Sequence, residues 1–332
     1  MYAIMINRLF SFGTQAVFLC REKELIMTET QESTTAKLCS FARAYHSNMD
    51  RQKIFDDYLA YDLMGKEEYE RIGELIDHDF EVGKSDQNYS FCSANIAERL
   101  RYYILPIPLS RIAFAEQKLY EFAQQHEKCQ YVVCGAGMDT FAFRNDNADI
   151  HVFELDHPNT GKYKRERVRQ LEWNIPENLT FVPIDFSKDN MQQKLLHAGF
   201  HPELPSFFAI LGVSYYLTLS VFEQTIETIG TLCSAHSKIV FDYPDETTLS
   251  RSGAERIHTL TEITEKLGEK MLHGYSFSEI DTALKKNGYQ IEDHRTPQEI
   301  QKAFFDNRTD GISAFENIHF ISAEKEYSNP KS

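Results

Sequence analysis

The sequence predicts an α/β fold: a doubly wound, mostly parallel sheet whose last strand is antiparallel, with an N-terminal helical cap. Two observations carry this prediction. From residue 131 onward, short apolar runs of the kind that form buried strands alternate with helical segments. Before residue 126 the apolar residues recur at helical spacing, with no strand signal of comparable strength.

The individual strands and helices follow from these runs and from residues that favour helix ends. We expect Ser220 and Glu223 to form a capping box that begins one helix, Ser278 to begin another, and Gly288 to end it. A helical insert at about 244–272 interrupts the alternation, at an edge of the sheet where inserts often border a ligand. The expected strands are 131–134, 150–155, 179–183, 207–211, 238–242, 289–292 and about 317–322.

The chain divides into three parts at the sequence level. We expect residues 1–34 to be disordered or to include a non-native start, because Met27 is a plausible first residue and a polar stretch follows it. The apolar stretch near residues 9–20 is too short and too polar to span a membrane, and it lacks the features of a signal peptide. Residues 35–126 form the expected cap and 127–325 the expected core.

The composition limits the classes of function. A formal net charge of −15 disfavours phosphate backbones and anionic lipids as partners, so we expect no nucleic-acid substrate and no membrane association. None of the six cysteines forms a CxxC pair, and no histidine lies at metal-ligand spacing from them. This favours a reduced, cytoplasmic protein without a metal site. The sequence does not predict an oligomeric state.

A glycine turn follows the first expected strand and is the main candidate site. Gly135 and Gly137, on either side of Ala136, allow a tight turn and close approach of a ligand to the backbone. About 20 residues later, Glu154 and Asp156 could hold the hydroxyl groups of a ribose. This pattern suits a dinucleotide or S-adenosylmethionine, or it is merely a strand-to-helix turn.

Two residues of the turn favour S-adenosylmethionine over a dinucleotide. Thr140 stands where the third glycine of a dinucleotide motif would fall, and Asp139 would repel a pyrophosphate while tolerating a cationic ligand. A nicotinamide- or flavin-binding oxidoreductase therefore remains as the weaker alternative.

The motifs together resemble the leucine carboxyl methyltransferase family, in particular its branch of bacterial proteins similar to polyketide O-methyltransferases. This resemblance spans about residues 36–325 and implies a Rossmann-like methyltransferase sheet that binds S-adenosyl-L-methionine. Arg111 precedes an Ile-Ala-Phe segment much as the family's helical arginine does. The matching segments are IFDDYLA (54–60), YVVCGAGMDTFAFR (131–144), VFELDHPNTGKYKRERV (152–168), FVPIDF (181–186) and GVSYYLT (212–218).

The resemblance also implies roles for individual residues. Arg111 would bind the carboxylate of the methyl donor, and the turn from Gly135 through Ala136 to Gly137 would line its methionine part. Asp156 would hold the ribose, while Glu154 would share that role or turn inward as a structural carboxylate. In the same way Asp185 and Phe186 would bracket the adenine, unless Asp185 only caps the segment after it. Many family members have a glutamate where this chain has Leu211, so another group must hold the donor's ammonium.

The methyl acceptor is less well defined than the donor. We expect a small molecule that is methylated on a carboxylate or a hydroxyl group. A carboxylate is ionised at neutral pH and needs no general base. A hydroxyl needs one, and the candidates are His157, Tyr215, Tyr216 and His273, of which the tyrosine pair is the best candidate for an acceptor contact. Arg51, Arg99 and Arg101 are possible partners of an acceptor carboxylate. A donor-binding module without catalysis is a further alternative.

Overall fold

The computed structural model describes residues 34–79, 96–250, 253–266 and 268–326. The expectation about residues 1–34 concerns residues outside these ranges except for Thr34, with which the first described helix begins. No helix in the described ranges is long and apolar enough to cross a membrane.

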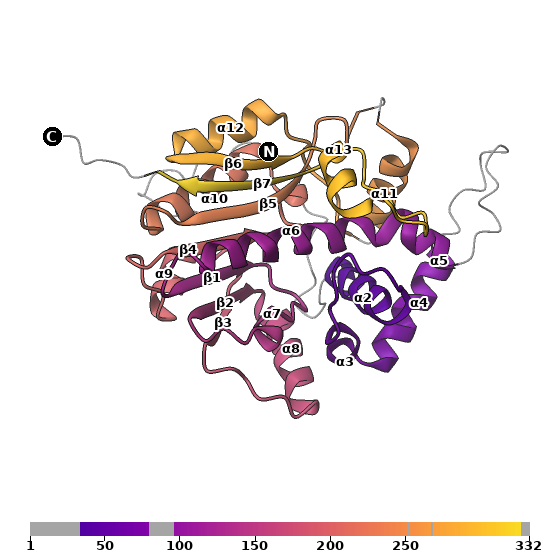
Figure 1. Ribbon diagram of the computed structural model, residues 1–332, viewed down its shortest axis with the longest axis horizontal. Coiled ribbons are helices and arrows are strands. Elements are labelled where there is room, and N and C mark those ends of the chain that lie inside the picture. Colours follow the sequence, from indigo (N-terminus) through magenta and orange to yellow (C-terminus); the bar gives the residue numbers. More distant parts are fainter. Residues whose placement is uncertain (1–33, 80–95, 251–252, 267, 327–332) are drawn as a thin grey trace, which may run out of the picture.

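A seven-stranded sheet in the order β3-β2-β1-β4-β5-β7-β6 forms the centre of the molecule (Figure 1). β7 runs antiparallel to both of its neighbours and the other pairs are parallel, as the sequence predicts. Every residue of β1, β4 and β5 is buried, which accounts for their nearly continuous apolar sequences. The strands are β1 (Cys129–Cys134), β2 (Ile150–Asp156), β3 (Leu179–Pro183), β4 (Ser206–Ile210), β5 (Lys238–Pro244), β6 (Tyr289–Arg295) and β7 (Ile318–Lys325).

Two hydrophobic cores lie on the two faces of this sheet. Val240 of β5 belongs to the core shared with the N-terminal helices, whereas its neighbours Ile239 and Phe241 belong to the core on the opposite face. The opposite face is covered by α9 (Met191–His197), α10 (Leu219–Leu232) and α12 (Phe277–Lys286). The remaining helices outside the cap are α7 (Phe141–Arg144), α8 (Pro158–Gln170), η3 (Ser214–Tyr216), α13 (Pro297–Ile300) and η4 (Gln301–Phe305).

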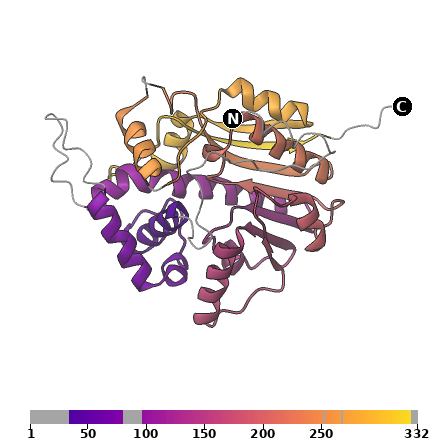
Figure 2. The same cartoon turned by 180° about the vertical axis from the view of Figure 1, so that it is seen from behind.

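The N-terminal helices gather at the edge of the sheet where β1, β2 and β4 end (Figures 1 and 2). They are α2 (Thr34–Met49), α3 (Ala60–Met64), α4 (Lys66–Asp79), α5 (Ile96–Arg99), η2 (Leu100–Ile104) and α6 (Pro106–Ala123). Within this segment α6 also packs along the sheet itself, because Phe114 meets Phe320 and Phe122 meets Phe207 at ring-centroid distances of 5.3 and 5.6 Å. Arg111 lies on this helix, so the sheet fixes its position.

The insert at about 244–272 contains one helix, α11 (Glu255–Lys266), which lies beside the cap end of α6 (Figure 1). The buried side chain of Arg256 holds this helix against the segment 313–315. Its guanidinium donates to the carbonyl of Ala314 at 2.6 Å and lies 3.8 Å from the centroid of the Phe315 ring. Burial lowers the pKa of Arg256, and these contacts compensate for the buried charge.

Two of the predicted helix starts are wrong by two residues. Thr218, in an extended conformation, accepts from the amide of Val221 and begins α10, so Ser220 lies inside its first turn. Ser276 forms a full capping box with Glu279 and begins α12, so Ser278 is an exposed helical residue. In both segments two hydroxyl residues stand two positions apart, and the backbone conformation selects the first. Gly288, at φ 75°, follows the end of α12 as expected.

Replacing Ser276 with alanine should lower the free energy of unfolding by ~1 kcal/mol, because the amide of Glu279 loses the hydroxyl that accepts from it, while the amide of residue 276 still donates to the Glu279 carboxylate. Ser278→Ala removes the same atom from an exposed position in the same helix and should change stability little. Urea unfolding of both variants measures the difference. An equal effect of the two substitutions would place the helix start elsewhere.

Candidate functional site

The glycine turn follows β1 and lies beside the end of β2, where the amides of Gly135 and Ala136 donate to the carbonyl of Leu155. Gly135 and Gly137 have φ values of 76° and 53°, a region that side chains with a Cβ rarely adopt. Both are also closely covered: a Cβ would lie 3.3 Å from Val213 at Gly135 and 3.4 Å from Ala36 at Gly137. The turn is therefore shaped for a close approach of other groups to its backbone.

Asp156, at the end of β2, reaches back to this turn. Its carboxylate accepts from the amide of Gly137 and, at 2.6 Å, from the amide of His157. Burial raises the pKa of Asp156, although these two amides act in the opposite direction. The predicted ribose residue is thus held against the glycine turn.

A fully buried carboxylate connects the cap to the other side of the turn. Asp57 accepts from the hydroxyl of Thr140 at 2.5 Å and forms an ion pair with Arg43 at 3.2 Å. Arg43 also donates to the carbonyl of Met138 at 2.8 Å. The F-D-D segment was recognised in the sequence, but no contact could be assigned to it. In the structure it fastens the cap to the glycine turn.

Asp139 has a local role in the same turn. It is 8% exposed and accepts from the amide of Phe141 at 2.7 Å, which satisfies a donor in the first turn of α7. The carboxylate is directed toward the helix that follows.

Glu154 turns inward to a buried ion pair. Its Oε2 atom lies 2.6 Å from the ammonium of Lys164, and both side chains are almost fully buried. Burial raises the pKa of Glu154 to about 7, while the charge of Lys164 acts to lower it. Of its two predicted roles, the contact with Lys164 corresponds to the structural one. Its Oε1 atom is buried and has no hydrogen-bond partner among the described residues.

Asp185 lies in the loop after β3 and makes local contacts. It accepts from the amide and the hydroxyl of Ser187 at 3.0 and 2.6 Å and pairs with Lys188 at 2.7 Å. Burial alone would raise the pKa of Asp185, but Lys188 and Ser187 lower it. The next residue, Phe186, is partly buried against the second core. These contacts match the capping alternative, and the adenine contact remains a prediction.

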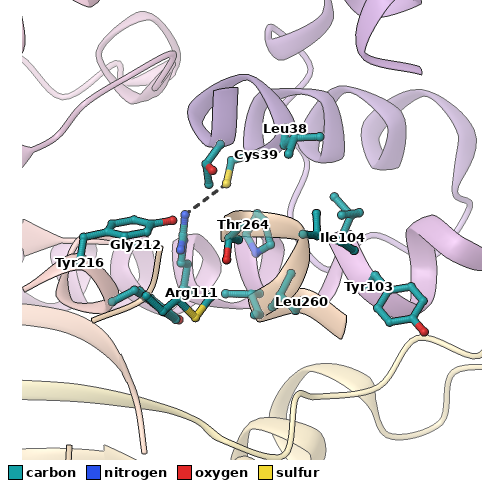
Figure 3. A pocket seen from close by; sticks show the side chains of 15 residues that line it. Leu38, Cys39, Tyr103, Ile104, Arg111, Gly212, Tyr216, Leu260 and Thr264 are labelled. Carbon is teal, nitrogen blue, oxygen red and sulfur yellow. Dashed lines mark hydrogen bonds between the residues drawn. The ribbon is translucent and has the colours of Figure 1, made fainter. Parts of the chain in front are cut away.

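A pocket lies between the cap, α6, α11 and the end of β4 (Figure 3). Arg111 is the one charged side chain among the described residues that line it, and Cys39 accepts from its guanidinium at 3.4 Å. The remaining lining residues are Thr35, Leu38, Tyr103, Ile104, Ile107, Pro108, Gly212, Tyr215, Tyr216, Leu260, Ile263, Thr264 and Met271.

Asp242, which sequence reasoning missed, is fully buried beside this pocket at the end of β5. Its carboxylate accepts from the amide of Gly212 and the hydroxyl of Tyr215, both at 2.7 Å, and pairs with Arg111 at 3.3 Å. Burial alone would lower the pKa of Arg111, but the charge of Asp242 and its hydrogen bond, together with Cys39 and Tyr215, outweigh burial and the pKa is raised. An acidic residue inside an apolar strand was the available signal.

The candidate bases are distributed unequally around the pocket. Tyr215 and Tyr216 line it, and burial raises the pKa of both hydroxyl groups. His157 instead caps α8, with its Nδ1 atom accepting from Asn159, and is not among the lining residues. His273 is also outside the lining and packs edge-on against the ring of Tyr275.

The arginines proposed for an acceptor carboxylate are likewise not among the lining residues. Arg101 pairs with Asp50 at 2.8 Å, Arg51 is exposed and Arg99 lies in the short helix α5. Within the part of the chain that the structure describes, no group of three or more His, Cys, Asp or Glu residues is arranged to hold a metal ion.

Comparisons with known proteins agree with this geometry. The family model described as leucine carboxyl methyltransferase matches residues 36–230. A Bacillus subtilis (strain 168) protein named as an S-adenosyl-L-methionine-dependent methyltransferase, YktD, is 36% identical over 90% of this chain and 100% of its own length. A similarly named protein of Mycobacterium marinum is 26% identical over 89% of this chain and 95% of its own. The solved structure of a duf574 family protein from Streptomyces avermitilis shares the fold, with a TM-score of 0.54 at 10% identity, over 90% of this chain and 99% of that chain.

Because of the buried Glu154–Lys164 pair, we predict that the free energy of unfolding depends on pH. The pKa of Glu154 rises from 4.5 to about 7 on folding, so between these values the folded carboxyl keeps a proton that the unfolded one releases. Raising the pH through this window should therefore remove ~3 kcal/mol of its contribution to the free energy of unfolding.

The double variant Glu154→Gln/Lys164→Met lacks this titration. Its unfolding free energy relative to the natural protein should thus improve as the pH rises from 5 to 8. Urea unfolding at several pH values measures the difference in unfolding free energy between the two proteins. The contributions of the other acidic groups are the same in both proteins and cancel in this difference. A difference that does not change with pH would contradict the raised pKa.

Proposed function

Because this chain belongs to the leucine carboxyl methyltransferase family and is an S-adenosylmethionine-dependent methyltransferase, we propose that it methylates a carboxylate oxygen of a small, largely apolar acid. The observation that carries this proposal is the lining of the pocket, which is mostly apolar; none of the described residues that line it is suited to removing a proton from an alcohol. The oxidoreductase alternative is not retained.

The residues of the glycine turn fit the methyl donor. We propose that the bare backbone at Gly135 and Gly137 lies against its methionine part, that Asp156 holds its ribose and that Arg111 binds its carboxylate. Asp185 and Phe186 are the proposed adenine contacts. When bound, the donor supplies a methyl group whose bond to sulfur breaks, with the electron pair staying on sulfur, as a bond to the acceptor oxygen forms.

The pocket suits an apolar acceptor next to this donor. Leu260 from the insert lies opposite Leu38 of the cap across it (Figure 3), and Ile104, Ile263 and Met271 also line it. Burial of an apolar body between these side chains contributes roughly 25 cal/mol per Å² of apolar surface removed from water. The protein's part in the reaction is to align the acceptor and the donor and to exclude water from both.

The protonation of the pocket favours a carboxylate over a hydroxyl acceptor. Burial raises the pKa of Tyr103, Tyr215 and Tyr216, so these hydroxyl groups keep their protons at neutral pH and do not act as bases. A carboxylate arrives already ionised and its charge is complementary to the positive donor. The positive charge of the donor faces the acceptor carboxylate, so this scheme needs no further cation for the acceptor besides Arg111, which pairs with Asp242.

Turnover of methyl-labelled S-adenosylmethionine with matched acids and alcohols tests the proposal. Each pair shares one carbon skeleton, for example a phenylalkanoic acid and the corresponding phenylalkanol. We expect label to appear with the acids and to be released as methanol by mild alkali, because methyl esters hydrolyse and methyl ethers do not. We also expect a rate that changes little between pH 6 and 8. Alkali-stable label on the alcohols would establish the hydroxyl alternative, and donor binding without any turnover would favour the non-catalytic module.

The pocket wall gives a specific prediction. Leu260→Trp places a larger side chain in the pocket and should raise the KM for the acceptor by at least about tenfold, with the affinity for S-adenosylhomocysteine within about twofold of the natural value. Glu262→Trp adds a tryptophan at an exposed position of the same helix and should change neither quantity. Initial rates and calorimetric titration measure the two effects. An equal rise in KM for both variants would place the acceptor outside this pocket.

A further inference from the structure

Two segments that are distant from Asp242 in the sequence, the stretch after β4 and the helix α6, meet at its carboxylate. The amide of Gly212 comes from the turn after β4, the hydroxyl of Tyr215 from η3 and the guanidinium of Arg111 from α6. The hydroxyl of Ser214 also donates to the backbone carbonyl of Asp242, at 2.6 Å. Asp242 itself is fully buried and does not line the pocket, so it can act on a ligand there only through these partners.

The guanidinium of Arg111 is packed directly on the turn after β4. Gly212 has a φ of 71°, and a Cβ built on it would lie 2.4 Å from Nη1 of Arg111. Because Asp242 accepts from both the Gly212 amide and Arg111, it sets the distance between the turn and the guanidinium. Arg111 and Gly212 both line the pocket (Figure 3).

We propose that Asp242 is the positioning residue for the amino-acid end of the methyl donor, because it holds Arg111 in place against the Gly212 turn. This inference rests on the proposed function, in which Arg111 binds the donor's carboxylate. Asp242 then keeps the guanidinium at one position through Nη1, so that Nη2, which donates to Cys39 in this structure, can donate to a second carboxylate.

Asparagine cannot replace this carboxylate. Oδ1 accepts from Gly212, and Oδ2 accepts from both Tyr215 and Arg111. An amide nitrogen in either place faces an N–H group that can only donate, so Asp242→Asn must release either the turn or the guanidinium. The substitution keeps the size of the side chain and removes the fixed position of Arg111.

A competing role for Asp242 predicts the opposite effect. If Asp242 only neutralises Arg111 and competes with the donor for it, removing its charge would leave the guanidinium free and tighten donor binding. The sign of the change in affinity therefore separates positioning from competition.

Calorimetric titration with two ligands tests the proposal on the full-length protein. S-adenosylhomocysteine carries the amino-acid end, whereas 5′-methylthioadenosine has the same nucleoside and sulfur without it. We expect Asp242→Asn to weaken binding of S-adenosylhomocysteine by at least about tenfold and to leave 5′-methylthioadenosine within about twofold. Ser214→Ala, which removes a hydrogen bond to the backbone of Asp242 and keeps the carboxylate, should leave both affinities within about twofold.

A thermodynamic cycle gives a second readout. In an Arg111→Met background, Asp242→Asn should have no further effect on the affinity for S-adenosylhomocysteine, because the residue through which it acts is gone. Should Asp242→Asn fail to fold, Asp242→Glu keeps the charge, displaces the carboxylate, and should still weaken S-adenosylhomocysteine selectively.

The results that overturn the proposal are distinct. Unchanged or tighter binding of S-adenosylhomocysteine would show that Asp242 does not position Arg111, and equal weakening of both ligands would reduce its role to general stability. If the natural protein binds neither ligand, the proposed donor site itself is wrong, an outcome that is visible before any variant is made.

Discussion

The helical cap and the glycine turn meet at one buried carboxylate, that of Asp57, and the geometry of the site depends on this contact. Asp57 is fully buried, yet Thr140 and Arg43 provide it with a hydrogen bond and an opposite charge. Loss of one partner from such a buried pair typically costs about 3–5 kcal/mol, which is large beside the stability of roughly 5–15 kcal/mol of an ordinary domain. The cap is therefore held in register with the turn, and the cap residues that line the pocket have a defined position.

The edge of the sheet at which the parallel strands end combines two kinds of surface. Near the ends of β1 and β2 the surface is polar backbone with a carboxylate behind it, supplied by Gly137 and Asp156. Near the ends of β4 and β5 it is apolar, with Arg111 at its base. In the proposed scheme, a donor that is charged at one end and an acceptor that is mainly apolar bind next to each other at these two surfaces.

The strands could be predicted from the sequence because buried parallel strands are short, largely apolar runs. Their order in the sheet was not predicted and comes from the structure. Helix starts were less accurate. For Thr218 and Ser220 the sequence favours Ser220, since Glu223 follows it three residues later, and only the backbone shows that Thr218 is the cap. For Ser276 and Ser278 the signal was available, because Glu279 follows Ser276 at capping-box spacing. The network around Asp242 could not be predicted, since an acidic residue in a strand does not reveal which distant donors it meets. The ion-pair partner of Glu154 could not be predicted either, because only the packing of α8 against β2 brings Lys164 to it.

Arg256 fixes α11 through contacts on the 313–315 segment, away from the side chains that the helix presents to the pocket. The backbone of this wall and the side chains that define its inner surface are therefore held by separate sets of interactions. Exchange of an inward-facing residue changes the volume of the pocket while the helix keeps its place. In this arrangement the range of acceptors can diverge among related proteins by a few substitutions, with the donor site and the fold left intact, and the same property makes the insert a practical starting point for redesigning acceptor choice.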